Sequence, residues 1–154
     1  MKEITLTQNQ VALIDDEDFD LISQHKWYTQ KTRFSNYAMA TIEKKHVMMH
    51  IFLLGKKEGK VIDHINGNGL DNRRKNLRFC SIAENVRNAH RTCGKSKYKG
   101  VSWHKYGKKW RAEIRYDYKA TYLGYFDTEE QAALAYNSKA LELFGEFACL
   151  NIIK

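Results

Sequence analysis

The sequence predicts an α+β protein in which a β-rich segment leads into a strand–loop–strand–helix, followed by a three-stranded antiparallel sheet packed on one helix. Three observations predict this class. Short apolar runs alternate with polar residues and end at polar turns, as strands do. Two capping boxes, Ser81 with Glu84 and Thr128 with Gln131, mark helix starts. No proline interrupts any of these elements.

The sequence pattern of residues 1–45 predicts a β-rich N-terminal layer. An acidic helical turn is expected at residues 15–24. Strands are expected at residues 4–7, 11–14, 27–29 and 37–40. We expect this layer to complete the core of the segment that follows, because nothing in it looks catalytic.

Residues 46–91 predict the strand–loop–strand–helix. Its first strand delivers Asp63 and His64 at its end, and residues 66–69 must then turn, because Asn and Gly tolerate positive φ. The chain returns as a strand at residues 77–80 and enters a helix at the first capping box.

Residues 92–97 are small, polar and basic and predict a linker. Residues 1–91 are therefore expected to form one domain and residues 98–153 a second. In the second domain a long helix is expected to end at Gly145, after strands at residues 101–103, 110–116 and 120–126. Three aromatic residues are expected in its core, with stacking on DNA as the alternative: Trp103, Trp110 and Tyr136.

The charge of the chain is strongly positive and unevenly placed. The 154 residues carry a formal net charge of +8, and 43% of them are hydrophobic, which indicates a folded basic protein rather than a disordered tail. Residues 46–95 carry 10 basic and 4 acidic residues, and residues 97–119 carry 8 and 2. Nucleic acid is the polyanion that such a chain is expected to bind.

Cysteine usage and hydropathy indicate the compartment. Cys80, Cys93 and Cys149 form neither a disulfide framework nor a zinc ribbon, so we expect buried thiols in a reducing, cytoplasmic environment. No apolar run is long enough to cross a bilayer, and the N-terminus has no signal peptide. Neither a membrane partner nor export is expected.

Residues 63–78 carry the residue types of a phosphodiesterase. A carboxylate stands beside an imidazole, followed by a tight polar loop, a block of cations and an asparagine. Hydrolysis of a phosphodiester needs a base for water, an oxygen that binds a metal and positive charge near the phosphate. The run, Asp-His-Ile-Asn-Gly and then Leu-Asp-Asn-Arg-Arg-x-Asn-Leu-Arg, resembles the core of an HNH endonuclease. The resemblance implies a ββα-metal (HNH) finger in residues 46–91.

The resemblance also implies roles for single residues. His64 would be the general base, and Asp63 a ligand of a divalent cation, with Mg²⁺ or Mn²⁺ expected at such oxygen donors. Asn76 matches the family's middle asparagine, whose amide oxygen would accept from the His64 imidazole N–H. Asn85 stands where many HNH enzymes have a metal-binding histidine and homing-type nicking enzymes have asparagine. His90 is the alternative ligand, about 140° further round the helix.

The loop and its surroundings carry further candidates. Asp71 and Asn72 are interpreted as a local turn, and His50 as a buried supporting histidine rather than a catalytic one. Four cations are expected to contact phosphate, with a solvated charged face as the alternative: Arg73, Arg74, Lys75 and Arg78.

A second family pattern covers residues 98–151. Its matching residues are Tyr98-Lys99-Gly100-Val101, Trp110-Arg111-Ala112-Glu113-Ile114, Leu123-Gly124-Tyr125-Phe126, Glu130-Gln131-Ala132-Ala133-Leu134-Ala135-Tyr136-Asn137, Gly145, Ala148 and Asn151. This set resembles the APETALA-type, or ethylene-response-factor, DNA-binding domain. In that family the three-stranded sheet, not the helix, lies in the major groove.

Alternation along the central strand predicts which face of the sheet meets DNA. One face carries Trp110, Ala112, Ile114 and Tyr116, and the other carries Arg111, Glu113 and Arg115. The apolar face should pack on the alanine-rich helix. Arg111 and Arg115 are then expected to contact base edges, with Glu113 ordering them. Other DNA contacts, mostly to phosphate, are expected from Ser102, His104, Lys105, Lys109, Lys119 and Tyr122, and from Lys97, Lys99 and Lys108.

The two patterns together predict a metal-dependent, homing-type endonuclease of a phage or mobile element. It would cut double-stranded DNA as a monomer or weak dimer inside a prokaryotic or phage-infected cell, with no small-molecule substrate. One alternative is a non-catalytic transcriptional regulator with a degenerate finger, against which the intact Asp63, His64 and Asn76 argue. Another is a nuclease acting on RNA or branched DNA, against which the double-strand reader argues.

Overall fold

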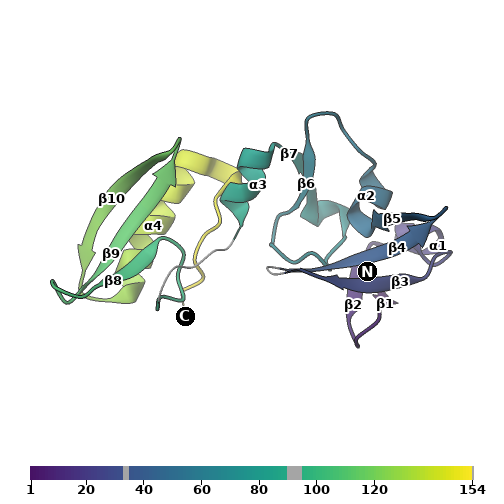
Figure 1. The fold of residues 1–154 in the computed structure, drawn as a ribbon, viewed down its shortest axis with the longest axis horizontal. Coiled ribbons are helices and arrows are strands. Elements are labelled where there is room, and N and C mark those ends of the chain that lie inside the picture. The colour runs from purple at the N-terminus through teal and green to yellow at the C-terminus, as the bar shows by residue number, and fades with distance from the viewer. Residues whose placement is uncertain (33–34, 90–94, 154) are drawn as a thin grey trace. The chain divides into compact units, whose positions relative to one another are not determined.

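The structure is a computed structural model that describes residues 1–32, 35–89 and 95–153 (Figure 1). The chain divides into two compact units, Met1–Asn85 and Val86–Lys154. Both units combine antiparallel strands with helices, so the predicted α+β class is confirmed. The predicted linker at residues 92–97 lies partly outside the described residues.

Among its described residues, the first unit contains three small antiparallel sheets. They are the hairpin of β1 (Lys2–Thr5) and β2 (Val11–Ile14), the meander of β3 (Trp27–Lys31), β4 (Asn36–Ile42) and β5 (Lys45–Met48), and the pair of β6 (Val61–His64) and β7 (Leu77–Cys80). The helical elements between them are η1 (Asp16–Asp18), α1 (Phe19–Ile22), α2 (Met49–Leu54) and η2 (Arg74–Asn76). The predicted β-rich layer is therefore present.

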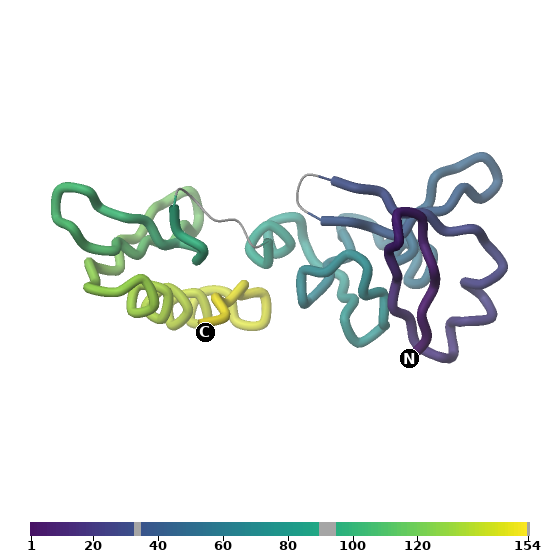
Figure 2. Tube along the Cα trace, turned by 90° about the horizontal axis from the view of Figure 1, so that it is seen from below, coloured from purple at the N-terminus to yellow at the C-terminus, as the bar shows by residue number. Residues whose placement is uncertain are grey.

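Strand β2 links the core of this unit to the loop that follows β6. Ala12 and Ile14 are fully buried, as the period-two alternation of a strand requires. Leu13 lies between them, and its backbone bonds to the loop: its N–H donates to Leu70 O, and its carbonyl accepts from Asn72 N–H, both at 2.8 Å. The N-terminal hairpin therefore fixes this loop from one side (Figure 2).

The strands β6 and β7 and the helix α3 (Ile82–Asn88) follow one another as a ββα arrangement. The register of the two strands sets Asp63 opposite Arg78. At the start of α3, Ser81 N–H donates to the Glu84 carboxylate at 2.7 Å, and Glu84 N–H donates to Ser81 Oγ at 3.2 Å. The predicted capping box is confirmed, and with it the predicted strand–loop–strand–helix order.

In the described part of the second unit a three-stranded sheet packs on one long helix, as predicted (Figures 1 and 2). Its elements are β8 (Val101–His104), β9 (Lys109–Tyr116) at the centre of the sheet, β10 (Lys119–Phe126), α4 (Glu129–Phe144) and η3 (Gly145–Phe147). Thr128 and Gln131 form the second predicted capping box. Ala132, Ala133 and Ala140 on α4 are fully buried, because small side chains let the helix approach the sheet closely.

The sequence did not predict β5 and α2. The six residues of α2 are almost all apolar, and no side chain bonds to its N-terminus, so its sequence pattern does not separate a short buried helix from a strand. Gly55 ends this helix with a φ of +72°, a value that glycine adopts without strain.

Two expectations from composition can be compared with the structure. Cys80 is buried as predicted, Cys149 is half-buried, and Cys93 lies outside the described residues. Among the described residues, no helix is both long and apolar enough to span a membrane.

Candidate functional site

Strand β6 ends at the two residues that were expected to carry the chemistry. Asp63 and His64 are only 5% and 6% exposed. Successive side chains of a strand leave on opposite faces, so the two have different neighbours. The Asp63 carboxylate accepts from the Arg78 guanidinium at 2.9 and 3.0 Å, and His64 Nε2 lies 3.5 Å from Asn72 Oδ1.

The imidazole of His64 is packed among other rings. Its centroid lies 4.9 Å from that of His50 on α2, with the two planes at 89°, and 5.9 Å from that of Tyr37 on β4. Burial lowers the pKa of His64, against the opposing effects of the Asn72 hydrogen bond and the charge of Asp63. Neutral imidazole is the form that accepts a proton, so burial prepares this ring to act as a base near pH 7.

His50 is buried, as expected. Burial, and then the charge of His64, lowers the pKa of His50 from its ordinary value of 6.5 to about 4. Its Nδ1 has no hydrogen-bond partner among the residues that the structure describes. His50 is therefore an uncharged ring near neutral pH, and its edge-to-face contact restrains the plane of His64.

Asn76 closes the loop between β6 and β7. Its Nδ2 donates to Asn66 Oδ1 at 3.0 Å and to Asp71 O at 2.7 Å, and its Oδ1 accepts from Asn66 N–H at 3.0 Å. We had expected this oxygen to accept from the His64 ring; a side-chain oxygen within reach of His64 Nε2 comes instead from Asn72. The reason is that Asn76 ends η2 and faces across the loop, whereas β2 holds Asn72 beside the ring.

Three of the four cations that were expected at phosphate are paired with carboxylates. The pairs are Arg73 with Asp71 at 2.6 Å, Arg74 with Asp18 at 2.7 Å, and Arg78 with Asp63 at 2.9 Å. All three carboxylates are buried, and a buried carboxylate is unfavourable without a cation beside it. These arginines are thus already engaged with carboxylates in this structure, and their contact with phosphate stays a prediction. Lys75 is exposed and has no ion pair with any described residue.

The donors expected for a metal are Asp63 and the half-buried Asn85 of α3. No cluster of three or more His, Cys, Asp or Glu side chains that could hold a metal lies among the described residues, and His90 lies outside them. A carboxylate and an amide oxygen nevertheless fit Mg²⁺, which proteins often hold by one or two carboxylates together with substrate phosphates.

The sheet of the second unit gathers cations on the face that points away from α4. Glu113 is ion-paired with Arg111 and, at 3.4 Å, with Arg115. Cross-strand partners share a face, which adds Ser102 opposite Arg111 and Tyr122 opposite Glu113. The expectation that Glu113 orders the two arginines is confirmed by these ion pairs.

Other residues expected to contact DNA lie around this face. The ring of His104 lies 4.8 Å from that of Tyr125, and Lys105 and Lys119 are exposed. Lys109 is ion-paired with Asp127. The two exposed lysines are therefore better placed for phosphate than Lys109.

Two residues of the second unit lie in surroundings that the sequence did not predict. Lys99 was expected at phosphate, but its Nζ donates to Arg87 O at 2.6 Å and to Ala89 O at 2.7 Å, where carbonyls at the end of α3 need donors. Trp103 was expected in the core, but it is 43% exposed and stacks edge-on against Trp110 at 5.1 Å. The cause is that β8 is an edge strand of the sheet.

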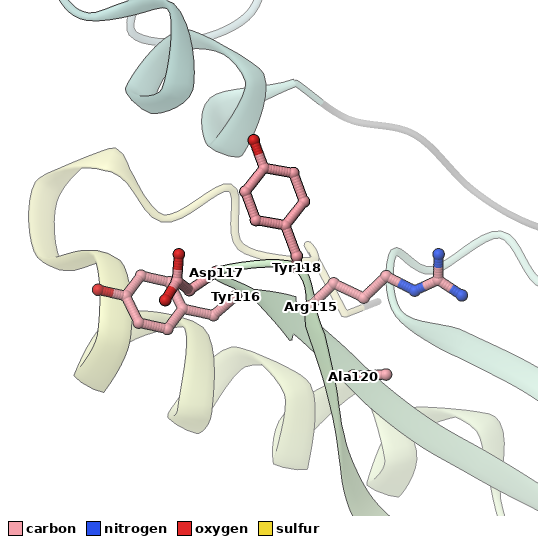
Figure 3. A pocket seen from close by; sticks show the side chains of 5 residues that line it. All are labelled: Arg115, Tyr116, Asp117, Tyr118 and Ala120. Atoms are coloured by element: carbon pink, nitrogen blue, oxygen red, sulfur yellow. The ribbon is translucent and has the colours of Figure 1, made fainter.

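A cavity of about 550 Å³ lies at the turn between β9 and β10 (Figure 3). Its lining residues are Arg115, Tyr116, Asp117, Tyr118 and Ala120. Asp117 and Tyr118 both have positive φ, which is the geometry of a tight hairpin turn. The lining pairs no nucleophile with a base, so we assign it no catalytic role.

Two residues at the candidate site around His64 were not assigned to it from the sequence. Asn72 was interpreted as part of a local turn, although it is fully buried beside His64. Tyr37 comes from the predicted β-rich layer, in which we saw nothing catalytic. The only sequence signal that could have assigned Asn72 to this site is its place within the His64 motif. No local sequence signal assigns Tyr37 to it.

Comparison with known families finds two matches along the chain. Residues 43–87 match the HNH endonuclease family, and residues 96–146 match the AP2 domain, which is the APETALA-type domain. The two matched segments contain the candidate site of the first unit and the sheet and helix of the second.

The similar proteins fall into two groups, a viral HNH endonuclease and plant transcription factors. An uncharacterized HNH endonuclease of Acanthamoeba polyphaga mimivirus is 29% identical over 144 residues, which are 92% of this chain and 75% of the viral protein. An ethylene-responsive transcription factor of Arabidopsis thaliana is 38% identical over 63% of this chain and 64% of its own length. A dehydration-responsive element-binding protein of the same plant is 49% identical over 36% of this chain and 27% of its own length.

Proposed function

We propose that this chain, which carries an HNH endonuclease domain followed by an AP2 domain, is a metal-dependent endonuclease that hydrolyses phosphodiester bonds in double-stranded DNA. The observation that carries the proposal is the position of His64. It is a buried imidazole with a lowered pKa, it follows Asp63, and it ends the first strand of a ββα arrangement. This residue set supplies a base and a carboxylate oxygen from adjacent positions at the end of the strand.

In this mechanism His64 takes the proton of a water molecule as the water oxygen attacks phosphorus and the bond to the leaving oxygen breaks. Asn72 and His50 hold the ring of His64, and Asn76 holds the loop beside it. Asp63 and Asn85 would hold Mg²⁺ or Mn²⁺. When bound, the ion supplies Lewis-acid stabilisation of the charge that develops on the phosphate.

The AP2 domain would choose the DNA sites. Arg111 and Arg115 project from a sheet face with no helix on it, and their guanidinium groups can bind guanine bidentately. Lys105 and Lys119 would contact phosphates, which contributes affinity but no sequence preference. A fragment of residues 95–154 should therefore bind duplex DNA in gel shifts, with an affinity that falls steeply with salt. The absence of binding at low salt would contradict this role.

A non-catalytic transcriptional regulator is the second candidate. The similarity to plant transcription factors favours it, because one of them matches 63% of this chain. The two candidates differ in one respect, since a regulator would bind DNA without cutting it. The homing role and a phage or mobile-element origin rest on the resemblance of the finger and on the viral relative.

Cleavage of supercoiled plasmid by the purified protein tests the proposal. We expect nicked or linear product with Mg²⁺ or Mn²⁺, and none after chelation. Asp63→Asn should raise the metal concentration needed for half-maximal cleavage, because it removes the charged oxygen donor. Cleavage that persists in excess chelator would show that the reaction needs no metal, and would refute the roles of Asp63 and Asn85 as metal ligands.

A further inference from the structure

The ion pair between Asp63 and Arg78 has an unusual place in the proposed site. The antiparallel register of β6 and β7 sets the two residues opposite each other, so the fold itself builds the pair. Both side chains are largely buried, at 5% and 12% exposure. Two guanidinium nitrogens, Nε and Nη2, donate to the same carboxylate oxygen, at 3.0 and 2.9 Å.

This geometry places a positive charge on the carboxylate that is expected to bind the metal. A buried carboxylate needs a cation, and the guanidinium supplies one in the metal-free protein. A divalent ion on that same oxygen, Oδ2, would compete with the guanidinium, because two cations on one buried oxygen repel each other strongly. Metal binding at this oxygen and the Arg78 contact are therefore alternatives.

We propose that Arg78 occupies Asp63 until a divalent cation binds, and that the displaced guanidinium then contacts the DNA phosphate. The inference rests on the proposed metal-dependent function. The register keeps Arg78 beside Asp63 on the neighbouring strand, and guanidinium binds phosphate through paired, charge-assisted hydrogen bonds. Arg78 is therefore a competitor of the metal at Asp63 and a phosphate ligand once DNA is present.

This exchange of partners predicts that metal binding raises the affinity of the protein for DNA, and that DNA binding raises its affinity for the metal. Without DNA, the ion must break the contact between Arg78 and Asp63, and no phosphate is present to accept the guanidinium. With DNA, the phosphate accepts hydrogen bonds from the displaced guanidinium, so part of the free energy lost with the Arg78–Asp63 ion pair is recovered. Such coupling is reciprocal and typically amounts to about 5–150-fold in affinity. Arg74 offers a matched comparison, because it also pairs with a buried carboxylate, that of Asp18, which is no expected metal ligand.

The test measures Mn²⁺ binding to the full-length chain by electron paramagnetic resonance, with and without a DNA duplex, in a His64→Ala background that prevents cleavage. We expect DNA to raise Mn²⁺ affinity about tenfold or more. Arg78→Met should bind Mn²⁺ more tightly without DNA, by a similar factor, and should show little further gain with DNA. Arg74→Met should behave as the parent. If circular dichroism shows that Arg78→Met is unfolded, Arg78→Gln removes the charge while keeping a hydrogen-bond donor.

Each outcome bears on a different claim. Equal Mn²⁺ affinity in the parent and in the folded Arg78 variants would overturn the role of Arg78, while the metal centre would stand if Asp63→Asn abolished binding. Binding that survives Asp63→Asn unchanged would instead remove the metal centre itself. Tighter binding in Arg78→Met with no loss of coupling to DNA would leave Arg78 as a competitor of the metal and refute its transfer to phosphate.

Discussion

Acidification should destabilise the first unit because of the buried imidazole of His50. Its pKa is about 4 in the folded chain, against an ordinary value of 6.5 that the unfolded chain regains. The folded state thus keeps His50 neutral where the unfolded state takes up a proton. The stability is fully present above pH 6.5 and is lost as the pH falls toward 4. Between pH 7 and pH 5 the loss amounts to about 2 kcal/mol from His50 alone.

Urea unfolding at several pH values measures this loss in the first unit. The indole N–H of Trp27 is a suitable probe, since it is buried in that unit and donates to Ile22 O at 2.8 Å. Its signal in proton–nitrogen correlation spectra reports the first unit separately from the second. In His50→Leu, the free energy of unfolding should depend less steeply on pH, by the slope that corresponds to about one proton bound on unfolding. A free energy of unfolding that is constant from pH 7 to pH 5, or an unchanged slope in His50→Leu, would refute the reasoning.

Three further predictions concern other parts of the chain. Gly100→Ala should destabilise the second unit by about 1–3 kcal/mol in thermal unfolding, because the new Cβ would lie 2.0 Å from the Tyr136 ring at a φ of +75°; an unchanged Tm would contradict this. Arg111→Ala should relax base preference by about 1–3 kcal/mol in competition gel shifts, whereas Lys105→Ala should weaken all sequences alike. Asn72→Leu should slow plasmid cleavage by about 10–100-fold, as loss of a group that orients a catalytic ligand does; wild-type cleavage would remove Asn72 from the site.

Local signals were enough to predict most of the secondary structure. Both capping boxes form because each needs only residues within one helical turn. Alternation in β9 predicted that Ala112 and Ile114 are buried and that Arg111 shares a face with Glu113. The same alternation failed at Tyr116, which is 45% exposed near the end of the strand.

Contacts between distant segments could not be predicted from the sequence. Arg74 donates to Asp18, which lies 56 residues earlier in the chain. From the sequence alone, the run of cations that contains Arg74 indicated a phosphate-binding surface, because this ion pair inside the unit has no local signal. The contact between Asn72 and His64 depends on where β2 holds the loop, which no spacing within the motif encodes. The motif identified the chemistry, and the tertiary structure decided which side chains support it.

The most direct test of the central claim compares the wild-type chain with His64→Ala on supercoiled plasmid in Mg²⁺. The account predicts that cleavage falls by about 10²–10⁴-fold, the usual effect of losing a general base. Affinity for duplex DNA in gel shifts should stay within a few-fold, because the sheet of the AP2 domain is intact. Cleavage at the wild-type rate by His64→Ala would contradict the assignment of His64 as the base that activates water.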